Sequence, residues 1–272
     1  MIVAKDGRLI LRCLSLSYIG ILVILPIFAL ISIVFKNNQA AIWAHITHPH
    51  AIYSLKITFF YALCIAIINC ITGTATAWVL VRYDFPLKKT MNTLIDLPFA
   101  IPTVVTGIML VTLYGPQSII GHFFARNGFH IIYNQPGIML ALLFVTFPFV
   151  VRAVQPVIIE MEKEMEEAAE ALGASPWTIF LKIILPTLSP AILTGTALSF
   201  SRALGEFGSI VIVAGNIPMK TQVASVYIYG EVESGNIPGA LGISLVLLLL
   251  SFSIILLLNI IQKWKRKYEE AK

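Results

Sequence analysis

Long runs of apolar residues alternate with short polar segments along most of this chain. A helix needs roughly 20 predominantly apolar residues to cross the hydrocarbon core of a membrane. Six segments are predicted as spans: 13–35, 57–81, 94–114, 137–151, 188–214 and 240–261. The fourth is long enough only if it continues to Ile159 and Arg152 snorkels toward the interface. The pattern therefore predicts an all-α, polytopic membrane protein with about six transmembrane helices.

Composition supports a membrane protein over a soluble domain. Apolar residues make up 58% of the chain and charged residues 12%, whereas soluble domains carry roughly 25% charged residues. Lysines and arginines sit beside the apolar runs and form no stripe with aromatics, so we expect a protein in contact with lipid and not with nucleic acid. The first run is about twice as long as a signal peptide's apolar region and lacks an A-x-A site, which predicts an uncleaved span.

The distribution of basic residues predicts the orientation. Of the 19 lysines and arginines, fourteen lie in the segments 1–12, 82–93, 152–187 and 262–272, four lie in the other loops and Arg202 lies within a span. Positively charged loops remain on the cytoplasmic side of a membrane. We therefore expect both termini in the cytoplasm, in agreement with an even number of spans.

Two outer segments are ambiguous. Residues 221–229 lie between two Asn-Ile-Pro turns and are too short to span, so we expect an interfacial or re-entrant piece covered by protein. His45, His48 and His50 resemble a metal cluster, but no carboxylate lies near them, and we expect a solvated loop.

The prolines at 98, 102 and 148 lie within predicted spans and are compatible either with a pathway or with a simple helix kink.

One inner segment, 160–182, is longer and more acidic than a simple connection. Six glutamates occur between Glu160 and Glu170, followed by Gly173, which permits a turn with positive φ. Ser175 and Pro176 suit the N-cap and first position of a second helix. We predict a helix–turn–helix at the cytoplasmic face that presents a knob to another molecule.

The spacing within this segment resembles the EAA loop of ABC importer permeases. Its residues are Glu167, Ala168, Ala169, Gly173, Ile183, Leu185 and Pro186. The resemblance implies a single transmembrane domain over 1–272, of the MetI-like permease fold, in which 160–186 holds the coupling helix that docks onto an ATP-binding subunit. The alternative, an acidic solvated helix with an incidental Gly-Pro turn, does not account for the complete spacing.

Three further runs resemble the T-type permeases of sulfate/thiosulfate importers. They are 97–107, which contains Thr103; 201–208; and 214–218 together with 221–224. Molybdate permeases share much of this pattern and remain the alternative substrate class. Gln222 departs from the family pattern, which has an acidic residue there.

Charged residues inside predicted spans are costly and often functional. Arg202 and Glu206, four residues apart, are expected on one helix face, either as a structural ion pair or as part of the anion pathway. With Thr103 they are the candidate pathway residues. Asp96 is expected near the inner end of its span, facing headgroups or the N-terminal pole of a helix.

The resemblance also implies the partners: a W-type permease in a heterodimer, two ATP-binding subunits and an extracytoplasmic sulfate-binding protein, in a bacterial inner membrane. The chain has no GxxxxGK[ST] phosphate-binding loop and no catalytic or metal-ligand spacing. Cys13, Cys64 and Cys70 have no CxxC spacing. We therefore expect a non-catalytic transport subunit without a cofactor; a secondary transporter or a membrane enzyme is the less favoured alternative.

Overall fold

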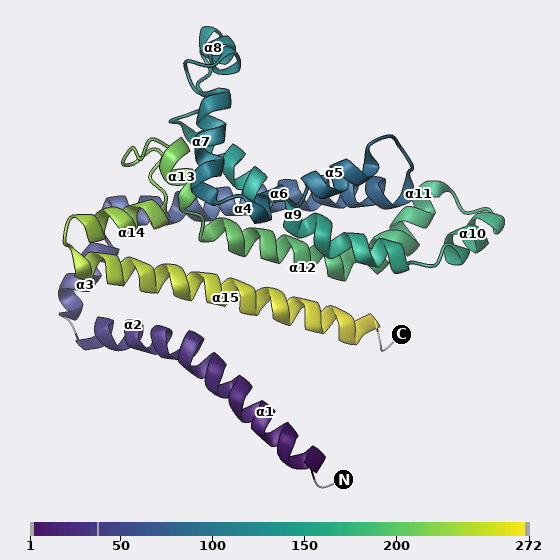
Figure 1. Ribbon diagram of the computed structural model, residues 1–272, viewed down its shortest axis with the longest axis horizontal. Helices are drawn as coiled ribbons and strands as arrows, with labels where there is room; N and C mark the ends of the chain where they lie inside the picture. Colours follow the sequence, from purple (N-terminus) through teal and green to yellow (C-terminus); the bar gives the residue numbers. More distant parts are fainter. Residues whose placement is uncertain (1–2, 37, 270–272) are drawn as a thin grey trace.

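The computed structural model describes residues 3–36 and 38–269, and every regular element within them is helical (Figure 1). The helices are α1 (Val3–Ile19), α2 (Leu25–Lys36), α3 (Gln39–Ile46), α4 (Pro49–Arg82), α5 (Lys88–Leu94), α6 (Leu97–Ala100), α7 (Thr103–Tyr114), α8 (Ile119–Arg126), α9 (Gln135–Glu160), α10 (Glu164–Ala171), α11 (Pro176–Ile179), α12 (Leu185–Leu204), α13 (Gly208–Val213), α14 (Ala224–Glu233) and α15 (Ile237–Glu269). Single π-helical turns join α1 to α2 and α11 to α12.

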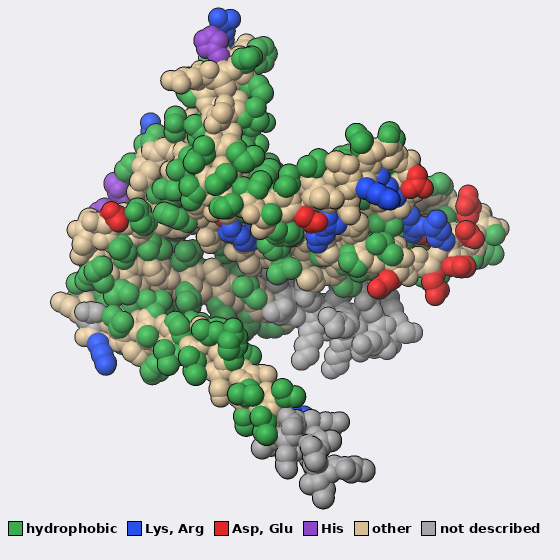
Figure 2. All heavy atoms as spheres, viewed as in Figure 1, with side chains coloured by type: hydrophobic (Ala, Val, Ile, Leu, Met, Phe, Trp, Pro, Cys, Tyr) green, Lys and Arg blue, Asp and Glu red, His purple; other side chains and the backbone are tan. Residues whose placement is uncertain are grey.

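The long helices α4, α9, α12 and α15 run alongside one another and form the body of the molecule (Figure 1). At one end lie α3 and α14, and at the other lie α10 and α11. Both ends of the described chain run toward the α10 end. Figure 2 shows acidic side chains gathered at this same end. The predicted placement of both termini and segment 160–186 on one side agrees with this arrangement, while which side faces the cytoplasm stays a prediction.

The described residues contain five helices long and apolar enough to cross a membrane, and a bent helix pair that makes a sixth if counted as one span. The five are Ile10–Lys36, Pro49–Arg82, Gln135–Glu160, Pro176–Leu204 and Ile237–Leu257. The all-α, multi-span prediction is confirmed, including the continuation of the fourth run past Arg152. The second span begins eight residues earlier than predicted because Pro49 and the His48 side chain, which accepts a hydrogen bond from His50 N, start α4 within the expected loop.

The third and fifth predicted spans are wrong as single straight helices. The third is bent by 115° between α6 and α7, at Ile101 and Pro102. Proline lacks the amide hydrogen that would continue the helix and forces the preceding residue into an extended conformation. The fifth begins at Pro176 and ends at Leu204, so the second helix of the predicted hairpin and the fifth span are one continuous helical segment.

Close helix packing centres on Val150 of α9. A Cβ atom added to Gly73 of α4 would lie 2.8 Å from the Val150 Cβ, and one added to Gly195 of α12 would lie 2.8 Å from the Val150 Cα. Both neighbouring helices therefore approach α9 at the same level through glycines, and Ala77, one turn along α4 from Gly73, is fully buried. Asn69 adds a polar contact among the same three helices, donating to the Thr146 Oγ1 (2.7 Å) and the Ser199 Oγ (3.1 Å).

The first span lies at the periphery. Only 6% of its most apolar stretch is buried within the chain, compared with 56% for α9. Leucines and isoleucines on α1 and α2 are exposed on most sides, as expected for a helix that lipid or another subunit surrounds.

The end opposite α10 is held by polar contacts. His45 lies 3.3 Å from the Asn236 Nδ2, which also donates to Glu231. Burial, followed by a hydrogen bond with Glu231, raises the pKa of Tyr227 to about 12. The segment predicted as an interfacial or re-entrant piece is the helix α14, whose Ala224 and Val226 are buried against the body.

Candidate functional site

The segment 160–186 forms the predicted helix–turn–helix. After α9 ends, α10 runs to Ala171, and Gly173 turns the chain with φ +83°. Ser175 caps α11, accepting a hydrogen bond from Thr178 N (3.3 Å), with Pro176 at the first helical position. A positive φ is accessible to glycine at little cost. The local signals in the sequence therefore predicted the hairpin correctly.

The surface of this hairpin is unusually exposed. Glu167, Ala168 and Gly173 face solvent, and no residue of α10 is buried. At the tip, Leu172 is 89% exposed and Trp177 is 68% exposed. A pair of large apolar side chains on a projecting acidic hairpin is typical of a surface that another protein covers.

The remaining residues of the EAA pattern lie where the hairpin joins the body. Ile183 is half-buried, while Leu185 and Pro186 begin α12 beyond the π-helical turn and are exposed. The helical segment Pro176–Leu204 contains 29 residues, so at 1.5 Å per residue it is about 44 Å long. It connects the hairpin directly to the second candidate site.

That second site contains Arg202 and Glu206. Their side chains form an ion pair, with 2.7 Å between Arg202 Nη1 and Glu206 Oε2. The prediction that both lie on one face of a span is wrong, because α12 ends at Leu204 and Glu206 lies in the break before α13. There Glu206, 1% exposed, accepts hydrogen bonds from the Ser209 N (2.9 Å) and the Ser209 Oγ (2.8 Å).

Glu206 therefore has two structural tasks, to neutralise Arg202 and to satisfy donors at the start of α13. The Ser225 hydroxyl also donates to the Glu206 carbonyl oxygen (2.7 Å), which fastens α14 to the same break. The Arg202 side chain remains 34% exposed. A partly open guanidinium with a buried counter-ion can meet an anion on its exposed side.

Thr103 lies beside this break although it is about 100 residues away in the sequence. A Cβ atom on Gly208 would lie 2.2 Å from the Thr103 Oγ1 and 3.0 Å from the Val104 N. The first turn of α7 therefore packs directly against the first turn of α13. Both turns follow a helix break, and the three candidate pathway residues are brought into one region.

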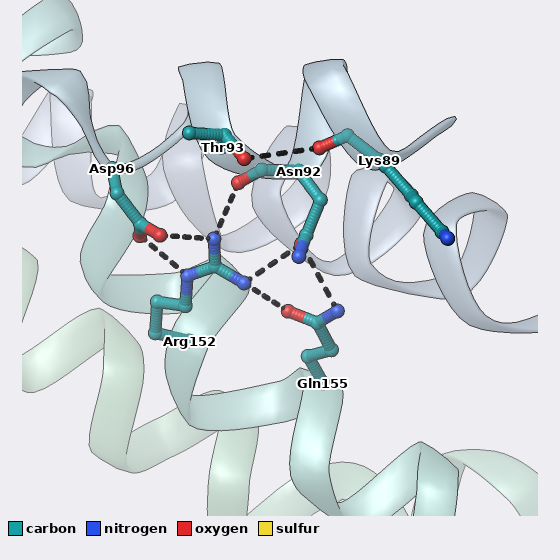
Figure 3. A network of polar contacts seen from close by, with 6 residues as sticks. All are labelled: Lys89, Asn92, Thr93, Asp96, Arg152 and Gln155. Atoms are coloured by element: carbon teal, nitrogen blue, oxygen red, sulfur yellow. Dashed lines mark hydrogen bonds and ion pairs between the residues drawn. The ribbon is translucent and has the colours of Figure 1, made fainter. Parts of the chain in front are cut away.

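A third polar cluster surrounds Arg152 (Figure 3). Its guanidinium bonds Asp96 in a bidentate manner, at 2.6 Å from Nε and 2.7 Å from Nη2, and donates to the Asn92 carbonyl oxygen (2.6 Å). The Asn92 Oδ1 (2.9 Å) and Gln155 complete its partners. All five guanidinium donors are thereby used. Asp96 lies at the N-terminus of α6, one of the two positions expected for it, but its side chain caps no backbone amide there. It pairs instead with Arg152, a contact that the sequence did not predict, and the pair fastens α5 and α6 to α9.

Other candidates do not form sites. Among the described residues, no group of three or more His, Cys, Asp or Glu side chains is placed to hold a metal ion. Cys13, Cys64 and Cys70 are free thiols.

With this geometry in view, comparison with known proteins decides the family. A sequence model of the family described as "Binding-protein-dependent transport system inner membrane component" matches residues 70–267. The chain belongs to this family. It is a multi-pass transport subunit of the membrane.

The relatives are similar over nearly the whole chain. A "Probable sulfate transport system permease protein cysT" of Chlorokybus atmophyticus is 45% identical over 94% of this chain and 89% of the relative. The "Sulfate transport system permease protein CysT" of Synechocystis sp. is 42% identical over 93% of this chain and 89% of the relative.

Solved structures confirm the permease fold. A bacterial ABC transporter that imports the acidic polysaccharide alginate has a chain with a TM-score of 0.78 and 18% identity, covering 96% of both chains. The MetNI methionine ABC transporter, in inward-facing conformations, has a TM-score of 0.61 and 16% identity over 84% of this chain and 99% of that chain.

Sequence reasoning missed two features of the site. The first is the exposure of the Trp177 side chain at the hairpin tip. The sequence shows an aromatic residue after the turn, but its exposure depends on tertiary structure. The Arg152 cluster joins α9 to Asp96 and Asn92, which are 56 and 60 positions from Arg152. In the sequence, only the cost of placing a charge in an apolar run could have indicated that Arg152 has a partner.

Proposed function

We propose that this permease forms half of the translocation pathway of an ATP-driven importer for sulfate/thiosulfate. The observation that carries the proposal is identity of 42–47% with proteins named sulfate transport system permeases. Under this proposal the chain pairs with a W-type permease, two separate ATP-binding subunits and an extracytoplasmic sulfate-binding protein. Both termini and segment 160–186 face the cytoplasm of a bacterial cell.

Segment 160–186 is the surface that meets the ATP-binding subunit. Its exposed hairpin, with the Leu172 and Trp177 side chains at the tip, supports a docking role. Because α11 continues into α12, a displacement of the hairpin shifts a single helical segment that ends beside Arg202. ATP-driven closure of the ATPase pair then switches the pathway between its outward and inward states.

The pathway itself runs past Arg202, with Glu206 and Thr103 beside it. A dianion leaving water needs compensating charge in a medium of low dielectric. The exposed part of the Arg202 guanidinium supplies this charge, and buried Glu206 holds the guanidinium in place. The oxyanion makes its polar contacts at the exposed guanidinium, while no chemistry occurs on this chain.

The test is ATP-dependent uptake of labelled sulfate by the complete transporter in proteoliposomes. We expect unlabelled sulfate and thiosulfate to compete for uptake more strongly than molybdate. Preferential competition by molybdate would assign the permease to that oxyanion instead. ATP-independent uptake driven by an ion gradient would overturn the importer proposal.

A matched pair of glycines tests the coupling surface in the same preparation. Gly173 (φ +83°) and Gly128 (φ +77°) share the conformation, and a Cβ on either meets nothing within 4 Å. Since Gly173 is exposed, an aspartate side chain there stays in solvent. Gly173→Asp should strain the turn and reduce sulfate-stimulated ATP hydrolysis at least about fivefold, whereas Gly128→Asp should leave it unchanged. Equal rates in both variants would remove the docking role from segment 160–186.

A further inference from the structure

The inner end of α4 touches the hairpin through one charged contact. Arg82, the last residue of α4, donates from Nη2 to the Glu166 Oε1 on α10. The two side chains are 11% and 21% exposed, respectively. The Arg82 guanidinium also lies 4.9 Å from the centre of the Trp78 ring, one helical turn earlier. The contact is therefore a shielded ion pair supported by a cation–π interaction.

Little else fastens α10 to the body. No residue of α10 is buried, and among the described residues Arg82–Glu166 is the one ion pair that joins α10 to another helix. Ala169 adds a partly buried apolar contact. A cavity of about 1010 Å³ lies between α4 and the hairpin, lined by Trp78, Tyr83 and Phe180 among others. Glu166, one member of the ion pair, also lines this cavity.

The chain connects the hairpin to the bundle at both ends, from α9 into α10 through residues 161–163 and from α11 into α12. The ion pair to α4 adds a side-chain attachment to a third helix. Because α4 and α12 are also joined by the Asn69–Ser199 hydrogen bond, a push on a hairpin attached in this way moves α4 and α12 together.

The Arg82 pair is built differently from the Arg152 cluster. Arg152 uses all five of its donors, while the buried Arg82 Nε has no hydrogen-bond partner. A saturated cluster is costly to open. The Arg82 pair leaves part of its bonding capacity unused, which suits a contact that shifts during a transport cycle.

We propose that Arg82 and Glu166 are positioning residues for transport, which transmit movement of the coupling hairpin to α4. This inference rests on the proposed function, because it requires that the hairpin meets the ATP-binding subunit. Breaking the pair removes the charged attachment of the hairpin to α4 and leaves its chain connections to α9 and α12. ATP hydrolysis then no longer drives α4 through this contact, and the number of anions transported per ATP falls.

The experiment compares variants in the complete transporter, reconstituted with its partner permease, ATPase and binding protein. The readouts are complex yield, sulfate-stimulated ATP hydrolysis and sulfate taken up per ATP hydrolysed. Glu166→Gln keeps the shape of the side chain and removes its charge. We expect normal yield and an uptake-to-hydrolysis ratio lowered about tenfold, because the neutral amide oxygen still accepts from Arg82 but without the attraction between opposite charges.

Charge-reversal variants distinguish an ion pair that transmits movement of the hairpin to α4 from one that only holds the two helices together. Arg82→Glu alone should lower the ratio further, and Arg82→Glu with Glu166→Arg should restore most of it. The control is Asp84→Asn, which breaks the exposed Lys88–Asp84 pair (2.9 Å) two residues from Arg82 and should change nothing. A wild-type ratio in Glu166→Gln would overturn the inference, as would a loss of yield that matches the loss of uptake in every variant.

Measured beside Glu166→Gln, the variants Gly173→Asp and Gly128→Asp distinguish failure of this inference from failure of the proposed function. If Gly173→Asp uncouples the transporter and Glu166→Gln does not, the hairpin docks as proposed but the ion pair transmits nothing. If neither variant affects coupling, the proposed function of the hairpin fails together with this inference.

Discussion

The Arg152 cluster should be a major source of stability for the attachment of α5 and α6 to α9. The perturbations are Asp96→Asn, which keeps the shape of the side chain, and Arg152→Met, which replaces the guanidinium with an unbranched apolar chain. Asp96 belongs to the segment between α5 and α6, while Arg152 lies on α9 (Figure 3). Loss of the contact therefore releases the first half of the broken third span from the body.

The magnitude follows from the contacts and their exposure. A hydrogen bond to a charged group contributes about 1.5–3 kcal/mol when shielded from water. The Asp96 side chain is 49% exposed, so screening by water reduces the cost of Asp96→Asn to about 1 kcal/mol. Arg152→Met leaves the acceptors of three residues without their donor, and with the Arg152 side chain only 27% exposed the cost rises to about 3 kcal/mol.

Thermal unfolding in lipid nanodiscs measures both costs. Each kcal/mol of lost stability should lower the melting temperature by on the order of 2–4 °C. The double variant should be no less stable than Arg152→Met alone, because Asp96 has then already lost its partner. Asp84→Asn, which breaks an exposed pair on the same side of the bundle, should leave the melting temperature unchanged. Additive shifts in the double variant would refute the reasoning, since they would show that the two side chains do not stabilise each other.

Three other predictions follow from the orientation, packing and pathway. In a cysteine-free background, a cysteine replacing Lys267 should be shielded from an impermeant thiol reagent in intact cells and one replacing Arg126 should react; labelling of position 267 from outside would contradict the six-span topology. Gly195→Ala should cost about 1–3 kcal/mol, since its Cβ would lie 2.8 Å from backbone of α9 that cannot move aside, and an unchanged melting temperature would contradict that packing. Arg202→Gln with Glu206→Gln removes both charges and keeps an acceptor for the start of α13, so we expect near-normal assembly with sulfate uptake lowered at least about tenfold; normal uptake would leave the pair a structural role only.

Local chemistry explains why the coupling hairpin could be predicted from sequence. The φ of Gly173, the cap by Ser175 and the first-turn Pro176 each depend on a few neighbouring residues. Apolar runs likewise report the number of spans, because the thickness of the membrane sets their length. Both kinds of signal are confirmed by the structure.

Breaks within apolar runs were harder to predict, because hydrophobicity says little about backbone direction. Residues 205–207 lie inside the predicted span 188–214, yet α12 ends at Leu204 and the Glu206 side chain accepts a hydrogen bond from Ser209 N. At Pro102 the sequence allowed either a kink or a break, and packing of α7 against α13 accompanies the 115° bend. The partner of Arg152 was equally inaccessible, since it depends on how distant helices pack.

The break between α6 and α7 and the break between α12 and α13 are related through the contacts made by the helices on either side of them. Before the third-span break, α5 and α6 are fastened to α9 by Arg152. After it, α7 packs on α13: a Cβ on Gly107 would lie 2.9 Å from both the Ser209 carbonyl oxygen and the Ile212 Cβ. The segment α13 in turn follows the break at the end of α12. Under the proposed function, a displacement that enters at the hairpin and travels along α12 reaches α13 and, through the packing of Gly107 and Gly208, α7. Thr103, Arg202 and Glu206 lie where these three helices meet, and we propose this junction as the place where the pathway responds to ATP.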